Sequence, residues 1–282
     1  MKYLITGATG DIGSKVVELL IHRGERPRVF VRDADKARKR FGDSVEVRVG
    51  DLDDATALRA ALEGIESLFL VNSGPAIPQR DELAAAAAKA ARVKHLVKLS
   101  SMDVNQKLAI GAWHERGEAV IRATGILFTF VQPTGFMSNL LAWAHSIRGE
   151  GVVRSATGEG RRAFIHSADI AEVATKALTT RDYYGQSLAI TGPEALSFFE
   201  VTARIGAAIG KQLKFQPISD DEARRRYSAV SGSDEETEAH VSLWRAIREG
   251  RLATVTDGVE RVLGRKPFTL DQWLIENKNY FL

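Results

Sequence analysis

The sequence predicts an α/β protein built on a doubly wound parallel sheet, and three observations lead to this prediction. Short runs rich in Val, Ile, Leu and Phe alternate with helix-like segments along the first half of the chain. The runs are nearly continuous apolar stretches, as is typical of parallel strands that helices cover on both faces. A glycine-rich turn joins the first run to the first helical segment. Together these features predict a sheet of Rossmann type with a smaller, mostly helical C-terminal substrate lobe.

Six strands and five helices are expected in the first half of the chain. The expected strands cover residues 3–5, 28–31, 45–49, 67–71, 95–99 and 127–131. The helical patterns between them cover residues 12–22, 35–41, 54–62, 79–92 and 111–124. The fourth of these helices contains a block of five alanines, which strongly favours helix.

The regular alternation ends after about residue 133. We expect a helix that carries Leu140, Leu141 and Trp143, and then a mobile loop over 149–162, which is rich in Gly and Arg. Ser167 or Asp169 can cap the helix that follows. The remaining expected elements are strands near 163–166, 187–190 and 213–217, helices over 170–178 and 198–210, and a polar hinge at 231–237 in a helical C-terminal part. The sequence therefore predicts two domains, 1–150 for the sheet and 151–282 for a smaller lobe partly threaded back onto it.

Composition excludes several classes of function. The 39 basic and 36 acidic residues leave a net charge of +3, too small and too evenly spread to indicate nucleic acid binding. The chain has no cysteine, which excludes disulfides and thiol catalysis, and no His or carboxylate ligands at recognisable spacing, so we expect no metal site. Its apolar segments are short and interrupted by charge, so we expect no membrane association and a cytoplasmic location. The helix-rich edge of the sheet is compatible with a homodimer.

The turn after the first strand has the geometry of a phosphate-binding loop. Gly7, Gly10 and Gly13 follow one another at three-residue spacing between a strand and a helix. The first glycine allows a tight turn, the second allows a pyrophosphate to approach the backbone, and the third allows the helix to lie close to the sheet. The amide groups and positive dipole of the helix N-terminus then face the anion. The alternative is an ordinary turn without a ligand. The candidate cofactor-binding residues here are Gly7, Thr9, Gly10, Asp11 and Ile12.

The end of the second strand indicates which dinucleotide is preferred. Folds that prefer NAD usually carry an acidic residue here to accept the ribose hydroxyls. This chain has Arg32, whose guanidinium can bind a 2′-phosphate, with Lys36 as a second cation one turn later. The residues therefore favour NADP(H), with NADPH preferred over NADH. The alternative is that Arg32 is only a surface residue and Asp33 binds the ribose, although Asp33 could instead cap the next helix.

Polar residues also follow the third and fourth strands at the same edge of the sheet. Asp51 can accept a hydrogen bond from the adenine amine and Leu52 can pack on the ring, although either residue could equally be a helix cap. Asn72 and Ser73 follow the fourth strand. Because ligands of open parallel sheets bind along the carboxyl edge, we expect these two residues to line the central part of the cofactor.

Several of these motifs together resemble a known family. They are Thr6-Gly7-Ala8-Thr9-Gly10-x-Ile12-Gly13, Val31-Arg32, Gly50-Asp51-Leu52, Ser100-Ser101 and Val131-Gln132-Pro133-x-x-Phe136-Met137-x-Asn139. This combination resembles the NmrA-like group of atypical short-chain dehydrogenases, over residues 1 to about 217. The group includes NADPH:quinone oxidoreductases, triphenylmethane and azo-dye reductases, and regulators that bind the nucleotide without turning it over.

The resemblance also implies where the nicotinamide and the substrate bind. In the family, the turn corresponding to Pro133–Asn139 passes the nicotinamide, which makes Pro133, Phe136 and Asn139 cofactor-binding candidates. An apolar wall above the ring would suit a flat aromatic acceptor. The substrate candidates are Phe136, Met137 and Trp143, with Phe164 as a further possibility, although core packing would explain Trp143 with similar ease.

The usual catalytic pair of short-chain dehydrogenases is missing. Those enzymes use a Tyr-x-x-x-Lys pair, in which the tyrosine donates a proton to the carbonyl oxygen. This chain has no tyrosine between Tyr3 and Tyr183, and His114 and Glu118 stand at the Tyr and Lys places. A histidine with its ordinary pKa of about 6.5 could protonate the product near neutral pH, with Glu118 orienting it. The alternative is a partly buried histidine with a structural role.

Two classes of function are consistent with the sequence. The first is an NADPH-dependent reductase that transfers hydride to a quinone-like or conjugated aromatic acceptor without a Tyr–Lys dyad, or its variant, a ketoreductase or epimerase of secondary metabolism. The second is a non-enzymatic regulator that senses NADP(H). The first class has a small aromatic or quinone-like substrate as its partner.

Overall fold

The computed structural model describes residues 2–282 and divides into two compact units, each described here by itself. The first unit comprises the chain up to Ser101 together with Ala112–Gln132 and Ser167–Ala189. The second unit comprises Met102–Gly111, Pro133–His166 and Ile190–Leu282. This division differs from the single boundary at residue 150 that the sequence predicts, because the chain passes between the units several times.

The first unit contains a seven-stranded sheet with the order β3-β2-β1-β4-β5-β6-β9. Its strands are β1 (Tyr3–Thr6), β2 (Arg28–Val31), β3 (Glu46–Val49), β4 (Ser67–Leu70), β5 (His95–Leu99), β6 (Leu127–Pro133) and β9 (Gln186–Ile190), of which β6 and β9 end at or beyond the edge of the unit. Neighbouring strands from β3 to β6 pair in parallel. At the centre of the sheet, Ile5 of β1 is aligned with Val29 of β2 on one side and Phe69 of β4 on the other. Strands β1 and β4 are buried along their whole length. The predicted α/β doubly wound fold is confirmed.

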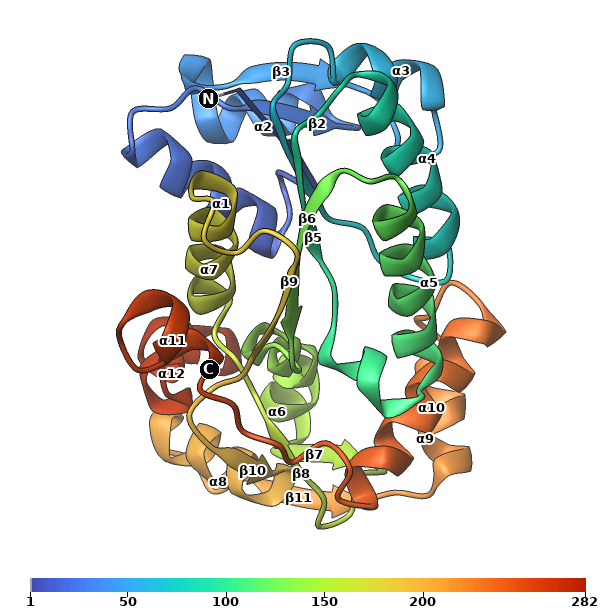
Figure 1. The fold of residues 1–282 in the computed structure, drawn as a ribbon. Helices are drawn as coiled ribbons and strands as arrows, with labels where there is room; N and C mark the ends of the chain where they lie inside the picture. The colour runs from blue at the N-terminus through green and yellow to red at the C-terminus, as the bar shows by residue number, and fades with distance from the viewer. Residues whose placement is uncertain (1) are drawn as a thin grey trace. The chain divides into compact units, whose positions relative to one another are not determined.

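Helices cover both faces of this sheet. They are α1 (Asp11–His22), α2 (Ala34–Phe41), α3 (Ala55–Ala61), α4 (Ile77–Ala90), α5 (Ala109–Ala123) and α7 (Ser167–Thr179), with a short 3₁₀ turn at Gly42–Ser44. Figure 1 shows α1 and α7 on one face and α4 and α5 on the other. Helix α7 begins at Ser167 rather than at Ile170 as predicted, so Asp169 lies in its first turn instead of before it.

The second unit has its own core and two small sheets. Strands β7 (Val152–Ser155) and β11 (Lys214–Pro217) pair in parallel, and β8 (Arg161–Ala163) pairs antiparallel with β10 (Ala195–Ser197). The surrounding helices are α6 (Ala144–Glu150), α8 (Phe198–Ile209), α9 (Asp220–Ser228), α10 (Asp234–Arg248), α11 (Gly258–Leu263) and α12 (Leu270–Asn277), with 3₁₀ segments at Met102–Gln106, Met137–Trp143 and Lys278–Phe281. The expected helix around Leu140 and Trp143 is therefore a 3₁₀ segment that leads into α6.

The prediction of a mobile loop over 149–162 is wrong. This segment contains β7 and the start of β8, and Val153 is completely buried. A side chain at Gly160 would lie 2.0 Å from the carbonyl oxygen of Ile247, so the chain packs directly against α10 here. The sequence suggested a loop because the partner of β7 is β11, about sixty residues further along the chain. Within residues 2–282, every helix is too short or too polar to cross a bilayer.

Candidate cofactor and substrate sites

The turn from β1 to α1 has the backbone shape that a phosphate-binding loop needs. Gly7 has a φ of +59°, in the left-handed region that favours glycine, and its carbonyl oxygen accepts a hydrogen bond from the Gly10 amide at 2.9 Å. A Cβ at Gly13 would lie 2.2 Å from that same carbonyl oxygen, so only glycine fits. Helix α1 begins after Gly10 without a side-chain cap, which leaves its N-terminus suited to an anion. The turn therefore fits a dinucleotide pyrophosphate.

A cavity of about 510 Å³ opens at this turn within the first unit. It brings together most of the cofactor candidates, which come from the carboxyl ends of β1, β2, β3 and β4: Gly7, Thr9, Gly10, Arg32, Lys36, Asp51, Leu52, Asn72 and Ser73. Of the candidates in the glycine-rich turn, Asp11 and Ile12 lie outside its lining. The Ile12 side chain, on α1, is buried, while Asp11 forms an ion pair with Lys15 and accepts a hydrogen bond from Ser167.

The two charged residues after the second strand, Arg32 and Asp33, have different partners in the structure. The Arg32 side chain is 84% exposed, and its Nε lies 3.9 Å from the Asp51 carboxylate. Asp33 caps helix α2, because its Oδ1 accepts a hydrogen bond from the Lys36 amide at 3.0 Å. If Asp33 bound the ribose, the same carboxylate would also have to cap α2. The cap of α3 is Asp54, so the alternative that Asp51 or Leu52 caps that helix is wrong.

Behind the cavity, Asn72 belongs to a buried polar network. The Asn72 amide donates a hydrogen bond to Asp81 Oδ1 at 2.8 Å, and Asp81 Oδ2 forms an ion pair with Lys98 Nζ at 2.6 Å. Neither Asp81 nor Lys98 has any exposed side-chain surface. Burial raises the pKa of Asp81, and the Lys98 ammonium and the Asn72 amide oppose that shift. A Cβ at Gly117 of α5 would lie 1.8 Å from Asp81 Oδ2, so that glycine makes room for the ion pair.

His114 lies in a different environment from the one the sequence suggested. Its side chain is buried, and its Nδ1 has no hydrogen-bond partner among the described residues. Burial, and secondarily the nearby Lys98 charge, lower the pKa of His114 to about 3. The imidazole is therefore neutral at pH 7, and the expectation of an acid that titrates near neutrality is wrong. Glu118 does not orient it, since the Glu118 carboxylate accepts hydrogen bonds from Ser100 at 2.6 Å and Gln132 at 2.8 Å.

The buried histidines predict a pH-dependent stability. Burial also lowers the pKa of His95, to about 4. The unfolded chain binds protons at these histidines below a pH of about 6.5, whereas the folded protein does not, so stability rises with pH in this window. We expect the free energy of unfolding to be level above pH ~6.5 and to fall towards pH ~4, by about 1.4 kcal/mol per pH unit for each histidine.

Urea unfolding at several pH values measures this slope. His114→Asn should remove one histidine's share, whereas His22→Asn, at an exposed position on α1, is the matched control and should leave the slope unchanged. An imidazole of His114 that titrates near pH ~6.5 by NMR would contradict the assignment.

The candidates for the substrate and for the nicotinamide end, Pro133 included, all lie in the second unit. Pro133 is the buried last residue of β6. Phe136 forms an isolated bridge with Ile165, and Met137 belongs to the core of the unit. Asn139 and Trp143 line a cavity of about 570 Å³, together with Phe164. The structure thus brings three of the predicted residues to this cavity, and it leaves Phe136 and Met137 out of its lining.

This cavity has an aromatic wall and a second wall that sequence reasoning missed. Phe198 lies between Trp143 and Phe164, with ring centroids 5.4 and 5.6 Å away. Tyr227 of α9 and His240 of α10 also line the cavity. His240 Nδ1 must donate to the Glu236 carbonyl oxygen at 2.9 Å, so the Tyr227 hydroxyl donates to Nε2 at 3.0 Å. The four-residue spacing of His240 and Trp244 on α10 was the available sign of an aromatic face.

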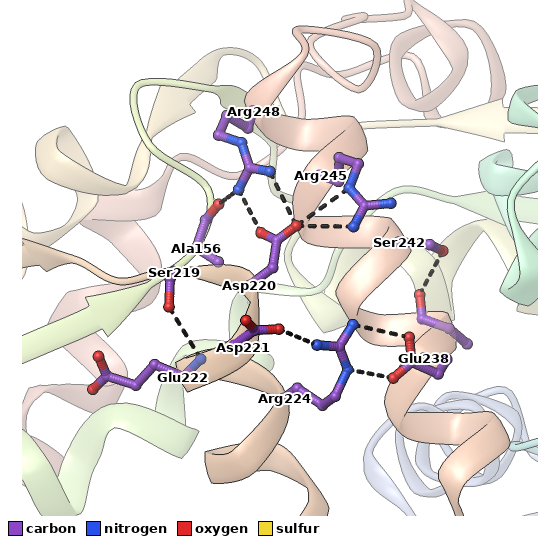
Figure 2. Close-up of polar contacts among 11 residues, drawn as sticks. Ala156, Ser219, Asp220, Asp221, Glu222, Arg224, Glu238, Ser242, Arg245 and Arg248 are labelled. Atoms are coloured by element: carbon purple, nitrogen blue, oxygen red, sulfur yellow. Dashed lines mark hydrogen bonds and ion pairs between the residues drawn. The ribbon is translucent and has the colours of Figure 1, made fainter.

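Ion pairs hold α9 and α10 together where they border the cavity. Figure 2 shows Asp220 of α9 between Arg245 and Arg248 of α10, with N–O distances of 2.9 and 2.8 Å. Arg224 reaches both Asp221 and Glu238, and Arg248 also donates to the carbonyl oxygen of Ala156, which follows β7. These contacts join the two consecutive helices to each other and to the segment after β7, and so support the wall that carries Tyr227 and His240.

Comparison with known proteins identifies the family. A family model described as NAD(P)H-binding matches residues 7–181, more than half of the chain. The chain belongs to this NAD(P)H-binding family. The resemblance to the NmrA-like group is confirmed. Separately, residues 2–282 contain no group of three or more His, Cys, Asp or Glu side chains that could hold a metal ion.

Several proteins similar to this chain are named as reductases or oxidoreductases. The chain is 37% identical to the (4-alkanoyl-5-oxo-2,5-dihydrofuran-3-yl)methyl phosphate reductase of Streptomyces griseus, over 99% of this chain and 98% of the relative. It is 35% identical to the NAD(P)H azoreductase of Xenophilus azovorans, over 96% of each chain. The structure of an NADPH-dependent quinone oxidoreductase from Escherichia coli in complex with NADPH is 25% identical, with a TM-score of 0.88 over 98% of this chain and 99% of that one. The protein is an NAD(P)H-dependent reductase of this family.

Proposed function

We propose that the protein transfers hydride from NADPH to a quinone-like or other conjugated aromatic acceptor, without the Tyr–Lys dyad. The observation that carries the proposal is the cavity of the second unit, whose Trp143, Phe164 and Phe198 form a wall suited to a flat aromatic molecule. The names of the azoreductase and the quinone oxidoreductase support the same class of acceptor.

The residues of the first unit account for binding of the nucleotide. The amides of the Gly7–Gly10 turn and the N-terminus of α1 bind the pyrophosphate. Arg32 and Lys36 bind the 2′-phosphate, which favours NADPH. Asp51 and Leu52 contact the adenine, and Asn72 and Ser73 line the central part. Pro133, Phe136 and Asn139 remain the candidates for the nicotinamide end on the family resemblance. When bound, the nucleotide supplies the hydride.

A neutral His114 fits this class of acceptor. A quinone or an azo bond is already electrophilic, and the product anion is delocalised, so hydride transfer needs little help from a pre-aligned proton donor. His114 is neutral at pH 7, and any contact it makes with the acceptor is that of a neutral imidazole. Phe136, Met137 and Trp143 remain the substrate candidates, of which Trp143 lines the cavity.

A cofactor-consumption assay tests the proposal. We expect loss of NADPH absorbance with naphthoquinone and with an azo dye, and none with cyclohexanone, which is not conjugated. Trp143→Ala should raise KM for naphthoquinone about 3- to 10-fold, the effect of losing an aromatic contact, with KM for NADPH unchanged. Heat-inactivated protein measures the direct reaction of NADPH with the quinone. Turnover of cyclohexanone without turnover of the quinone would contradict the proposal.

A further inference from the structure

The aromatic cavity of the second unit has a buried cation in its lining. Arg162 of β8 is 6% exposed and lines the cavity together with the aromatic residues Trp143, Phe164 and Phe198. No described residue accepts a hydrogen bond from its Nε. A buried guanidinium with an unsatisfied donor is costly unless something compensates it, and in a cavity that can be a ligand.

The neighbouring carboxylate compensates Arg162 only weakly. The oxygens of Asp103 lie 3.5 and 3.4 Å from Nη2, whereas charge-assisted hydrogen bonds are usually about 2.7 to 2.9 Å long. The other two arginines of the cavity have closer partners, since Arg154 lies 2.6 Å from Glu150 and Arg226 lies 2.9 Å from Glu222. Among the cavity's arginines, Arg162 therefore has the longest ion-pair distance, and its Nε donor has no partner among the described residues.

The backbone around Arg162 is shaped to hold the guanidinium in place. A Cβ at Gly135 would lie 2.5 Å from Arg162 Nε, so the guanidinium lies directly on the turn that follows β6. Strand β8, which carries Arg162, is held by its pairing with β10. A planar cation in a fixed position, lining the same cavity as three aromatic rings, is suited to a molecule that is flat and apolar at one end and anionic at the other.

We propose that Arg162 forms an anion subsite, which selects acceptors that carry a carboxylate, sulfonate or phosphate on a flat apolar frame. This inference rests on the proposed function in that the cavity is taken as the acceptor site. Asp103 competes with the ligand anion for the same guanidinium, so the two residues have opposite effects on binding. A purely structural Arg162–Asp103 pair would not have this property.

Binding of two matched fluorescent probes tests the subsite without any turnover. Anilinonaphthalene sulfonate and N-phenylnaphthylamine share one aromatic frame and differ in the sulfonate. In the wild-type protein the sulfonate should bind about 10-fold more tightly than the neutral probe, as a charge-assisted contact provides. Arg162→Gln should weaken binding of the sulfonate about 10-fold and leave the neutral probe unchanged. Asp103→Asn should strengthen binding of the sulfonate.

Control variants separate this effect from general loss of structure. Arg226→Gln removes another cavity arginine, already paired, and should change the affinity for either probe less than about 2-fold. Arg162→Lys keeps the charge without the planar fork and should give an intermediate affinity, which preserves the test if the glutamine variant does not fold. Equal loss of both probes in Arg162→Gln, or weaker sulfonate binding in Asp103→Asn, would overturn the proposal.

Kinetics with a matched pair of quinones connect the subsite to the reaction. Arg162→Gln should raise KM for naphthoquinone sulfonate about 10-fold and leave KM for methylnaphthoquinone unchanged. A rise in KM for NADPH instead would identify Arg162 as a cofactor contact and overturn the assignment. If neither quinone is reduced, the proposed function fails, whereas the probe affinities still decide whether the anion subsite exists.

Discussion

Lys98→Met is expected to destabilise the protein by about 3–5 kcal/mol, because it leaves the buried Asp81 carboxylate without its partner. Both side chains are fully buried, and their charged atoms are 2.6 Å apart. The two residues join strand β5 to helix α4 below the nucleotide cavity, and Asp81 also holds the Asn72 amide. The same variant should therefore weaken NADPH binding, since Lys98 no longer holds Asp81, the partner of Asn72, in position. Urea unfolding at neutral pH, with and without NADPH, measures both effects.

Two further variants test whether burial is the cause. Lys94→Met removes the lysine that immediately precedes β5, in an exposed pair with Glu66, and should cost no more than about 1 kcal/mol. The double variant Asp81→Leu with Lys98→Met should recover much of the lost stability, because an apolar pair of similar volume does not have to be desolvated. A cost for Lys98→Met as small as that of Lys94→Met would refute the argument.

Arg32→Ala is expected to raise the Kd for NADPH by about 10- to 100-fold and to change the Kd for NADH by less than about 2-fold. The two nucleotides differ only in the 2′-phosphate, and Arg32 is the exposed cation that borders the cavity next to Asp51. Lys36→Ala should have a smaller effect in the same direction, because an ammonium binds phosphate as a point charge rather than with a planar fork. Titration of each nucleotide by fluorescence measures the two constants.

The control for Arg32 is an arginine on α2, the helix that follows it, which does not line the cavity. Arg38 of α2 is exposed and pairs with Asp35, and Arg38→Ala should leave both nucleotide affinities unchanged. An equal loss of NADPH and NADH binding in Arg32→Ala would show that the arginine stacks on the adenine instead. Unchanged affinity for both would support the view that Arg32 is only a surface residue.

Local patterns explain why so much of the first unit could be predicted. The strand–turn–helix arrangement at Gly7 to Gly13 depends on backbone conformation and close approach, which are properties of the residues themselves. The possibility that Asp33 caps a helix was visible for the same reason, because a cap bonds an amide three residues away. The nucleotide cavity followed, since the carboxyl ends of parallel strands meet at one edge.

The prediction failed where partners are distant in sequence. Residues 149–162 resembled a loop because glycine and arginine are common in loops, whereas the pairing of β7 with β11 orders them. Arg162 was one of several arginines in that stretch, and nothing near it in the sequence shows that it borders an aromatic cavity. Tyr227 and His240 lie on two helices with no shared motif, and only the packing of α9 on α10 brings the hydroxyl to the imidazole.

The sequence alone determined the α/β class, the position of the dinucleotide turn and the absence of the Tyr–Lys dyad. Each of these features depends on residues that are close together in the sequence. Tertiary structure decided the protonation and the pairing of the buried groups. An unperturbed histidine has a pKa of about 6.5 whatever its sequence neighbours. Burial, and secondarily the Lys98 charge, lower the pKa of His114 to about 3. Lys98 and Asp81 are likewise ordinary charges until α4 packs on β5 and removes both from water. Desolvation depends on what covers a group, and that is a property of the folded chain.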